Sequence, residues 1–366
     1  MKVTTRKPLA IIIAVLLAVL VILITGCESE VAPTTVSPAK MGTPVRLVFT
    51  AQPSEAAAGL PFNPRPVVAA VDEQGNIVTT YRGRVVLTIT AGTGTSGAHL
   101  FGGINVGLVN GLVEFRDLFI DKAGAGYTLT ATCRNLEPAT SKPFTVSPGP
   151  PYELAFTVQP SGGVAGSPFT TPAEVTVQDR FGNTVTGYEG AVTIAFLYGS
   201  KPRGAVLSGI TTVRVVNSKA RFTDLTINKA YPEYKLTATS PDLCQTTSQT
   251  FGISAATPAK LEFTVQASGA RAGTPFETQP KVAVEDIYGN VVTSSRASVT
   301  VSITPGTGTA GAILSGTKTL IAESGLGGLA EFTDLSIDQA GSGYMLTATS
   351  SGLASATSQP FDVVVP

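Results

Sequence analysis

The sequence predicts an all-β protein made of tandem two-layer β-sandwich domains. Three observations support this prediction. A set of residues recurs at intervals of about 107 positions along most of the chain. Within each repeat, apolar residues alternate with polar ones, which is the period of a strand with one buried face. Glycine and proline are frequent, at 38 and 25 of 366 residues, and they bound the alternating segments as turn residues do.

The internal repeat divides the chain. The interval of 107 residues separates three Gly-Asn pairs, three phenylalanines and three glutamines: Gly75-Asn76, Gly182-Asn183 and Gly289-Asn290; Phe62, Phe169 and Phe276; Gln52, Gln159 and Gln266. Later landmarks show that the third copy has gained three residues, around the glycine-rich stretch Ser324–Gly327. We expect three domains, with boundaries at 44–150 (repeat 1), 151–258 (repeat 2) and 259–366 (repeat 3).

Alternation within the repeats defines the strands. Equivalent apolar positions two residues apart occur in every copy: Val85, Leu87 and Ile89; Val192, Ile194 and Phe196; Val299, Val301 and Ile303. About seven such segments fit into each repeat of roughly 100 residues, which is the strand count of an immunoglobulin-type sandwich. We therefore expect three tandem immunoglobulin-like β-sandwich domains.

One tyrosine in each repeat refines this prediction. Tyr127, Tyr234 and Tyr344 each follow a turn of small residues and open a segment of alternating pattern. This is the place of the tyrosine corner of a sandwich, with a buried ring and a hydroxyl bonded to nearby backbone. Two residues later, where antibody domains carry a disulfide cysteine, the sequence has leucine. We expect these cores to be closed by packing rather than by a disulfide.

Three motifs in order carry a family resemblance. A pattern close to V-x-D-x-x-G-N-x-V lies at Val71–Val78, Val177–Val185 and Val284–Val292. It is followed by F-x-D-L-x-I, as at Phe222–Ile227, and then by Y-x-L-T-A-T. Over residues 44–366 the chain resembles bacterial immunoglobulin-like domains of the invasin and intimin type, and more loosely filamin-type repeats. The resemblance implies the fold, and a role as stalk, spacer or adhesive tip.

The first 43 residues predict export and anchoring. Lys2, Arg6 and Lys7 precede an apolar run over residues 9–24, which is typical of a signal peptide. The segment Ile24–Cys27 resembles the lipobox of bacterial lipoproteins, which implies cleavage after residue 26 and lipidation of Cys27. Residues 27–43 then form the lipidated cysteine and a flexible spacer. The alternatives are an uncleaved membrane helix, for which the apolar run is at the short limit for crossing a bilayer, and a soluble secreted protein.

Composition excludes several function classes. The formal net charge is zero, and removal of a leader with three basic residues leaves 22 basic and 25 acidic residues, so nothing favours a nucleic-acid partner. The chain has one histidine, no tryptophan and three cysteines, which leaves little material for catalysis. We expect a non-enzymatic protein with no cofactor, no metal and no small-molecule substrate.

The turns at Asp72, Asp179 and Asp286 are the first candidate sites. An aspartate near an Asn could suggest calcium. One carboxylate per site is poor for a cation that takes six to eight oxygens, however. We favour a turn in which the aspartate caps backbone amides and glycine supplies a positive φ, and we keep calcium as the alternative.

Other candidates have simple structural interpretations. Gly92–Gly97 matches G-x-G-x-x-G, but no helix is expected after it, so it is predicted to be a loop. His99 aligns with Val206 and Ile313, which predicts a partly buried position in a strand. Cys133 and Cys244 lie in different repeats and are expected to be free thiols.

Exposed aromatic residues could form a sugar-binding platform. Tyr81, Tyr188, Tyr198 and Phe101 are the aromatic residues least clearly assigned to a core, but none of them is favoured as a ligand contact. The ligand-binding residues are therefore left unassigned.

The expected function follows from the anchor, the spacer and the repeats. Short, proline-containing junctions predict a semi-rigid rod of about 100 Å. We expect a lipid-anchored protein of the cell envelope that acts outside the cytoplasm as a structural stalk or an adhesin. The alternative is a lipoprotein that captures a polysaccharide or a protein through loops that differ between repeats, such as Tyr198–Arg203 or the insertion in repeat 3.

Overall fold

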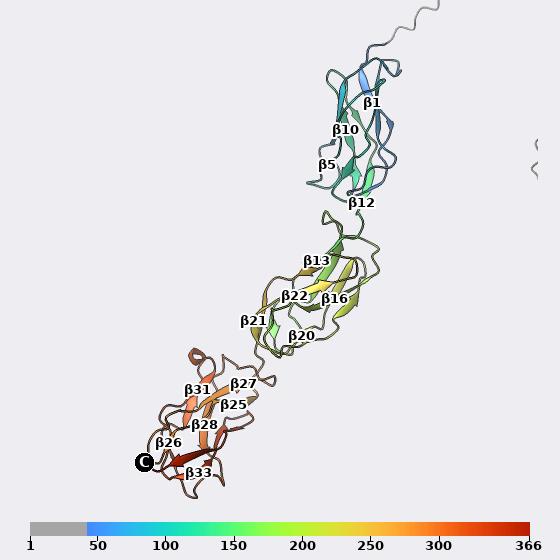
Figure 1. The fold of residues 1–366 in the computed structure, drawn as a ribbon. Coiled ribbons are helices and arrows are strands. Elements are labelled where there is room, and N and C mark those ends of the chain that lie inside the picture. Colours follow the sequence, from blue (N-terminus) through green and yellow to red (C-terminus); the bar gives the residue numbers. More distant parts are fainter. Residues whose placement is uncertain (1–41) are drawn as a thin grey trace, which may run out of the picture. The chain divides into compact units, whose positions relative to one another are not determined.

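The computed structural model describes residues 42–366, and residues 43–366 form one unit. The expected signal peptide 1–26, the lipidation site Cys27 and nearly all of the spacer lie outside the described residues. Within the described part of the chain, 36 short strands and one 3₁₀ helix make up the regular structure. Each of the three repeats contributes twelve strands in the same order. Figure 1 labels β1, β13 and β25, with which the three copies begin.

The strands are brief and are interrupted by turns. Those of repeat 1 are β1 (Arg46–Ala51), β2 (Ala56–Ala57), β3 (Val67–Val71), β4 (Arg84–Ile89), β5 (Leu100–Phe101), β6 (Asn105–Gly107), β7 (Leu112–Glu114), β8 (Phe119–Ile120), β9 (Gly124–Tyr127), β10 (Leu129–Thr132), β11 (Ala139–Thr140) and β12 (Phe144–Ser147). Those of repeat 2 are β13 (Glu153–Val158), β14 (Gly163–Val164), β15 (Ala173–Gln178), β16 (Ala191–Phe196), β17 (Leu207–Ser208), β18 (Thr212–Arg214), β19 (Lys219–Phe222), β20 (Thr226–Ile227), β21 (Tyr231–Tyr234), β22 (Leu236–Thr239), β23 (Thr246–Thr247) and β24 (Phe251–Ser254).

The third copy follows the same scheme with one addition. Its strands are β25 (Lys260–Val265), β26 (Ala270–Arg271), β27 (Lys281–Glu285), β28 (Ser298–Ile303), β29 (Leu314–Ser315), β30 (Thr319–Ile321), β31 (Leu329–Glu331), β32 (Ser336–Ile337), β33 (Gly341–Tyr344), β34 (Leu346–Thr349), β35 (Ala356–Thr357) and β36 (Phe361–Val364). The extra residues of this copy form the 3₁₀ helix η1 (Ser324–Leu326) in the turn before β31.

Each repeat is a two-layer sandwich. In repeat 1 one layer has the order β1-β3-β7, and the other joins β11-β10-β4-β6 with β2-β12-β9, because β9 and β10 are two halves of one strand position. All these pairs are antiparallel except β2 with β12. Repeats 2 and 3 reproduce this topology. The expected all-β, immunoglobulin-like fold class is confirmed.

The buried side chains form three clusters, each within a single repeat. They span Leu47–Val146, Leu154–Ile253 and Leu261–Val363. Alternation holds as expected: Val85 and Leu87 are fully buried, as are their equivalents in the other copies, and the residue between them is not. Each cluster therefore supplies its own sandwich with a core.

The tyrosine corner is present three times. Tyr127, Tyr234 and Tyr344 have no exposed surface, and each hydroxyl donates to a backbone carbonyl five residues earlier, at 2.8–2.9 Å. In one respect the sequence prediction was wrong: each tyrosine ends a strand rather than opening one, and the chain resumes two residues later at a buried leucine. The single residue between the tyrosine and the leucine therefore marks the point where the strand changes from one partner strand to another.

The corner in repeat 2 gives a pH-dependent prediction. Burial raises the pKa of Tyr234 to about 12, against 10.0 for an exposed phenol. A buried phenol with a raised pKa stabilises the fold below pH 10, and this contribution is lost as the pH rises toward 12. Tyr234→Phe should cost about 1 kcal/mol at neutral pH through the lost hydrogen bond. The free-energy gap between the two proteins, measured by urea unfolding, should shrink above pH 10. A gap that stays constant would contradict the burial of this hydroxyl.

Candidate functional site at the repeat junctions

The three Asp turns are built as the sequence predicts. In repeat 2 one oxygen of Asp179, Oδ1, accepts the backbone amides of Phe181 and Asn183 at 2.9 and 3.0 Å. Gly182 adopts a φ of +78°, which a side chain would disfavour. Asp286 caps its turn in the same way, and Asp72 caps the amide of Asn76 at 2.8 Å. The turn interpretation is confirmed.

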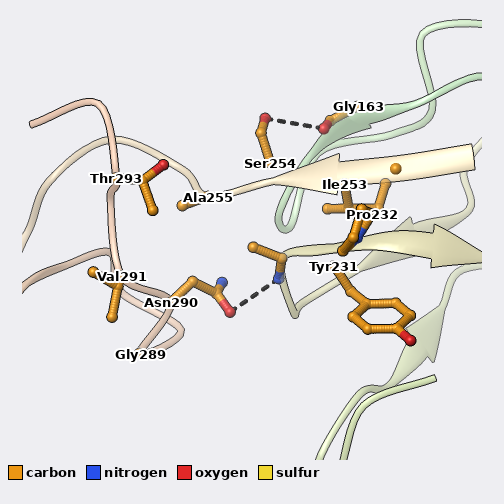
Figure 2. Close-up of a pocket in the computed structure, with 12 residues that line it drawn as sticks. Gly163, Tyr231, Pro232, Ile253, Ser254, Ala255, Gly289, Asn290, Val291 and Thr293 are labelled. Carbon is orange, nitrogen blue, oxygen red and sulfur yellow. Dashed lines mark hydrogen bonds between the residues drawn. The ribbon is translucent and has the colours of Figure 1, made fainter. Parts of the chain in front are cut away.

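In repeats 2 and 3 the asparagine of the turn also bonds to the preceding repeat. The Asn183 amide group donates to the carbonyl of Asp121 at 2.7 Å and accepts the amide of Ala123 at 2.9 Å. Asn290 does the same with the carbonyl of Asn228, at 2.8 Å, and the amide of Ala230, at 3.0 Å. Figure 2 shows the bond from Ala230 to Asn290 across the junction.

The second oxygen of each aspartate holds the connecting segment. Asp179 Oδ2 accepts the amide of Gly149 at 2.7 Å, and Asp286 Oδ2 accepts the amide of Ala256 at 2.8 Å. The same oxygen also accepts the asparagine side-chain amide at 2.8 Å in both junctions. We call each set of an aspartate, an asparagine and the backbone groups they bind a junction clasp. Because its donors and acceptors are all paired, the clasp is buried without leaving polar groups unsatisfied.

An aromatic ring packs beside each clasp. Phe181 lies against Gly59 of repeat 1, and Tyr288 lies against Gly166 of repeat 2, so that a Cβ on either glycine would overlap the ring. In the first junction Phe119 adds a second ring, 6.1 Å from that of Phe181. Each junction therefore combines a polar clasp with an aromatic contact that only glycine permits.

The clasp aspartate of repeat 3 is held in its ionised form. Asp286 has no exposed surface. Burial alone would raise its pKa, but hydrogen bonds from the Asn290 side chain and from three backbone amides outweigh burial and hold the pKa below the ordinary 3.8. Lys229 adds a cation nearby, since its Nζ donates to the carbonyl of Tyr288 at 2.6 Å.

Repeat 1 carries the same turn without the cross-junction bonds. Within the described residues, the side-chain amide of Asn76 bonds only to Asp72, at a longer 3.3 Å. Where Phe181 and Tyr288 stand in the later repeats, repeat 1 has Gln74. The Asp72 turn therefore shows which hydrogen bonds this motif forms when it makes no bonds to another repeat.

The cavities at the junctions offer little for chemistry. An open cavity of about 760 Å³ lies between repeats 2 and 3, and Figure 2 shows part of its lining, including Ile253, Val291 and Thr293. No acidic or basic side chain lines it. A smaller cavity of about 450 Å³ at the first junction includes Asp179 and Arg180, of which the first is engaged in the clasp.

The prediction for His99 was wrong. It expected a partly buried strand position, but the His99 side chain is 71% exposed, and Val206 and Ile313 are also exposed. What the three positions share is the backbone amide, which bonds to the side chain of Asp121, Asn228 or Asp338 at 2.7–2.8 Å. The identity of the side chain is therefore free to vary.

The remaining sequence candidates lie apart from the junctions. The Gly92–Gly97 segment is a loop that leads into β5, as expected. Cys133 and Cys244 are free thiols. Tyr81 and Tyr188 pack against the cores, and their hydroxyls contact Cys133 and Ser240.

The other two aromatic candidates differ in exposure. Phe101 is 42% exposed and stacks on Phe119, whereas Tyr198 is fully exposed. Among residues 42–366 no group of three or more His, Cys, Asp or Glu side chains is arranged to hold a metal ion. Over the same residues, no helix has the length and apolar character needed to cross a bilayer.

Sequence reasoning found the turns but missed their role in joining the repeats. A signal was available, because Gly59 and Gly166 keep the 107-residue period and precede repeats that carry Phe181 and Tyr288 in the turn. That pairing of a small residue with an aromatic residue of the next copy marks a contact between copies.

Comparison with known proteins finds only weak likeness to solved structures, at low sequence identity. No protein-family model matches the sequence, and no curated protein matches it. Among solved structures, the Escherichia coli adhesin FdeC is 16% identical over 88% of this chain and 96% of its own, with a TM-score of 0.34. Invasin, a bacterial integrin-binding protein, is 15% identical, with 88% and 60% covered and a TM-score of 0.30. Domains 4–9 of the surface-layer protein SbsC are 15% identical, with 88% and 47% covered and a TM-score of 0.23. The chain thus spans less than two thirds of the latter two.

The clasp predicts a local effect of one asparagine. Asn290→Ala removes two bonds across the second junction and leaves buried partners unpaired, which should cost about 1–3 kcal/mol. Hydrogen exchange of the Ala230 amide should accelerate about tenfold or more, since 1.4 kcal/mol is a factor of ten. The matched control is Asn76→Ala, which has no such bonds among the described residues and should leave the exchange of the Ala123 and Ala230 amides unchanged. Equal exchange at Ala230 in the wild type and the Asn290→Ala variant would contradict the clasp.

The clasp also predicts weakening in acid. Asp286 has a depressed pKa, so its contribution to stability is present above the ordinary value of 3.8 and is lost as the pH falls through the lower folded-state pKa. Protease cleavage near Ala256 should therefore increase below pH 3.8 before the cores unfold. An Asp286→Asn variant should show this susceptibility already at neutral pH. Cleavage that sets in only with global unfolding would count against the prediction.

Proposed function

We propose that the protein is a non-enzymatic, lipid-anchored stalk or short adhesin of the cell envelope. Its three repeats, 44–150, 151–258 and 259–366, would act as separate domains that extend the protein away from the membrane and contact other surfaces. The observation that carries this proposal is the junction clasp, which occurs in the same form at both junctions. A stalk that holds its terminal domain away from the membrane requires fixed junctions between its repeats, and it does not require a ligand-binding pocket.

The anchor part of the proposal rests on the sequence. An apolar run that stops just before Cys27 supports a signal peptide 1–26, and residues 27–43 would then be the lipidated cysteine and a spacer. Two or more acyl chains hold a protein stably on a bilayer, where one would be marginal. The location would then be outside the cytoplasm, with the membrane as one partner and a surface protein or polysaccharide as another. No nucleic acid, small-molecule substrate or cofactor enters the proposal.

The resemblance to invasin-type domains supports the stalk more than host-cell binding. Adhesins of that type are usually tethered by an outer-membrane barrel, and here the sequence indicates a lipid instead. The second candidate function is ligand capture through the repeat loops. It is favoured by one observation, the fully exposed Tyr198 in a loop where repeat 2 differs from its neighbours.

A single substitution tests the anchor. Cys27→Ser in the full-length protein should prevent lipidation, so that the protein moves from the membrane fraction to the soluble fraction. Metabolic labelling with a fatty-acid analogue should mark the wild type and not the variant. Cys133→Ser is the matched control and should change neither result. A Cys27→Ser protein that remains in membranes would favour the uncleaved helix over the lipid.

A further inference from the structure

One corner of the sandwich is built alike in repeats 1 and 3. In repeat 1 the hydroxyl of Thr95, in the loop after β4, donates to the carbonyl of Ala123 at 2.7 Å. In repeat 3 Thr309 makes the equivalent bond to Ala340 at 2.8 Å. The loop is thereby tied to the segment leading into β9 or β33, which begins with small residues, Gly124 or Gly341. Repeats 1 and 3 therefore show that a threonine hydroxyl and small residues are enough to form this corner of the sandwich.

Repeat 2 has rebuilt this corner with larger side chains. Pro202 stands where the tying threonine would be, so the hydroxyl bond is lost. Tyr231-Pro232-Glu233 replaces the Gly-Ala-Gly of repeat 1 and the Gly-Ser-Gly of repeat 3. The Tyr231 ring packs edge-on against Tyr234, with centroids 5.4 Å apart, and Phe196 also stacks on Tyr234, at 5.5 Å. In Figure 2 the Tyr231 ring points away from Asn290, although Tyr231 and Pro232 both contribute to the lining of the junction cavity. Tyr231 therefore lines both the junction cavity and the rebuilt corner.

An open groove of about 380 Å³ lies at the rebuilt corner. The side chains that line it are those of Leu197, Tyr198, Ser200, Tyr231, Glu233, Lys235 and Thr250. Ser200 fixes the loop, since its hydroxyl donates to the carbonyls of Leu197 and Lys235. Within residues 42–366, the hydroxyls of Tyr198 and Tyr231, the Glu233 carboxylate and the Lys235 ammonium form no hydrogen bond or ion pair with the protein. They are the groups available to a ligand.

We propose that this groove on repeat 2 binds a neutral oligosaccharide chain. The fully exposed Tyr198 offers a ring face for the C–H face of a pyranose ring, and both tyrosines offer phenol hydroxyls for hydrogen bonds, which suits a ligand that is apolar on one side and polar on the other. The Glu233 carboxylate can accept hydrogen bonds from sugar hydroxyls, and the Lys235 ammonium can donate them. One acid and one base give the groove no net charge, so nothing in it selects a polyanion or a polycation.

A peptide is the less suitable occupant. The strand β21 is the edge of the three-stranded sheet β14-β24-β21, and an exposed edge is where an extended peptide would add as a new strand. Pro232 lies within β21 and has no amide hydrogen to donate, so it disfavours strand addition. The groove is also shallow and polar, unlike the apolar pockets that take drug-sized molecules. This proposal rests on the second candidate function, ligand capture through the repeat loops, and names its ligand class; it holds whether or not Cys27 carries a lipid.

The test uses the full-length protein, purified in a detergent without sugar headgroups, on an array of neutral oligosaccharides, acidic oligosaccharides and peptides. We expect binding to one or more neutral oligosaccharides. Tyr198→Ala and Glu233→Gln should each weaken it about tenfold or more, as expected for the loss of a stacking ring or of a charged hydrogen-bond acceptor. Both residues are exposed, so the thermal unfolding midpoint should not change.

Two controls distinguish binding at this groove from non-specific binding. Phe101→Ala removes an exposed ring of repeat 1 and should leave binding unchanged. Replacing Tyr231-Pro232-Glu233 by Gly-Ala-Gly restores the sequence of repeat 1 and should abolish binding. The proposal is overturned if no neutral oligosaccharide binds, if the repeat 2 variants bind as the wild type does, or if only peptides or acidic sugars are retained. Because none of these variants touches residues 1–43, failure here leaves the proposed anchor and stalk untouched.

Discussion

A buried carboxylate at each junction is the interaction on which the arrangement of repeats depends. An isolated buried charge would be strongly unfavourable, but Asp179 and Asp286 each accept bonds from the turn, from the connecting segment and from an asparagine side chain. The same asparagine bonds to the preceding repeat. At each junction one aspartate–asparagine pair therefore closes the turn, holds the connecting segment and binds the preceding repeat. A substitution that disrupts one of these contacts should weaken the other two.

The sequence predicted the fold well because local chemistry determines it. Strand alternation, the tyrosine corner and the leucine two residues later each depend on neighbours within one repeat, and Tyr127 and Leu129 are fully buried as expected. The error at His99 had the opposite origin. The equivalent residues are Val206 and Ile313, which suggested that the His99 side chain packs in the core. The position is instead fixed by a hydrogen bond from its backbone amide to Asp121. A backbone hydrogen bond does not restrict the type of side chain, so it could not be predicted from the sequence.

The junctions were the harder part to predict. The Asp turn could be recognised from spacing, since Gly and Asn supply what a turn requires. That the amide of Asn183 faces Asp121 of another repeat depends on where the end of one sandwich meets the start of the next, and no period in the sequence encodes this. Differences between the repeats gave more information about a binding site. The sequence showed that the loop at Tyr198 differs from its equivalents in repeats 1 and 3. The change at Tyr231 could be connected with it only from the structure, in which both residues line one groove.

The most direct test of the account measures how firmly one repeat is held to the next. Cys133 and Cys244 lie in repeats 1 and 2 and can carry spin labels on either side of the first junction. Pulsed electron spin resonance should give a narrow distance distribution for the wild type and for Asn290→Ala, and a clearly broader one for Asn183→Ala. A broad distribution in the wild type, or no change on Asn183→Ala, would contradict the claim that the clasp fixes the junction.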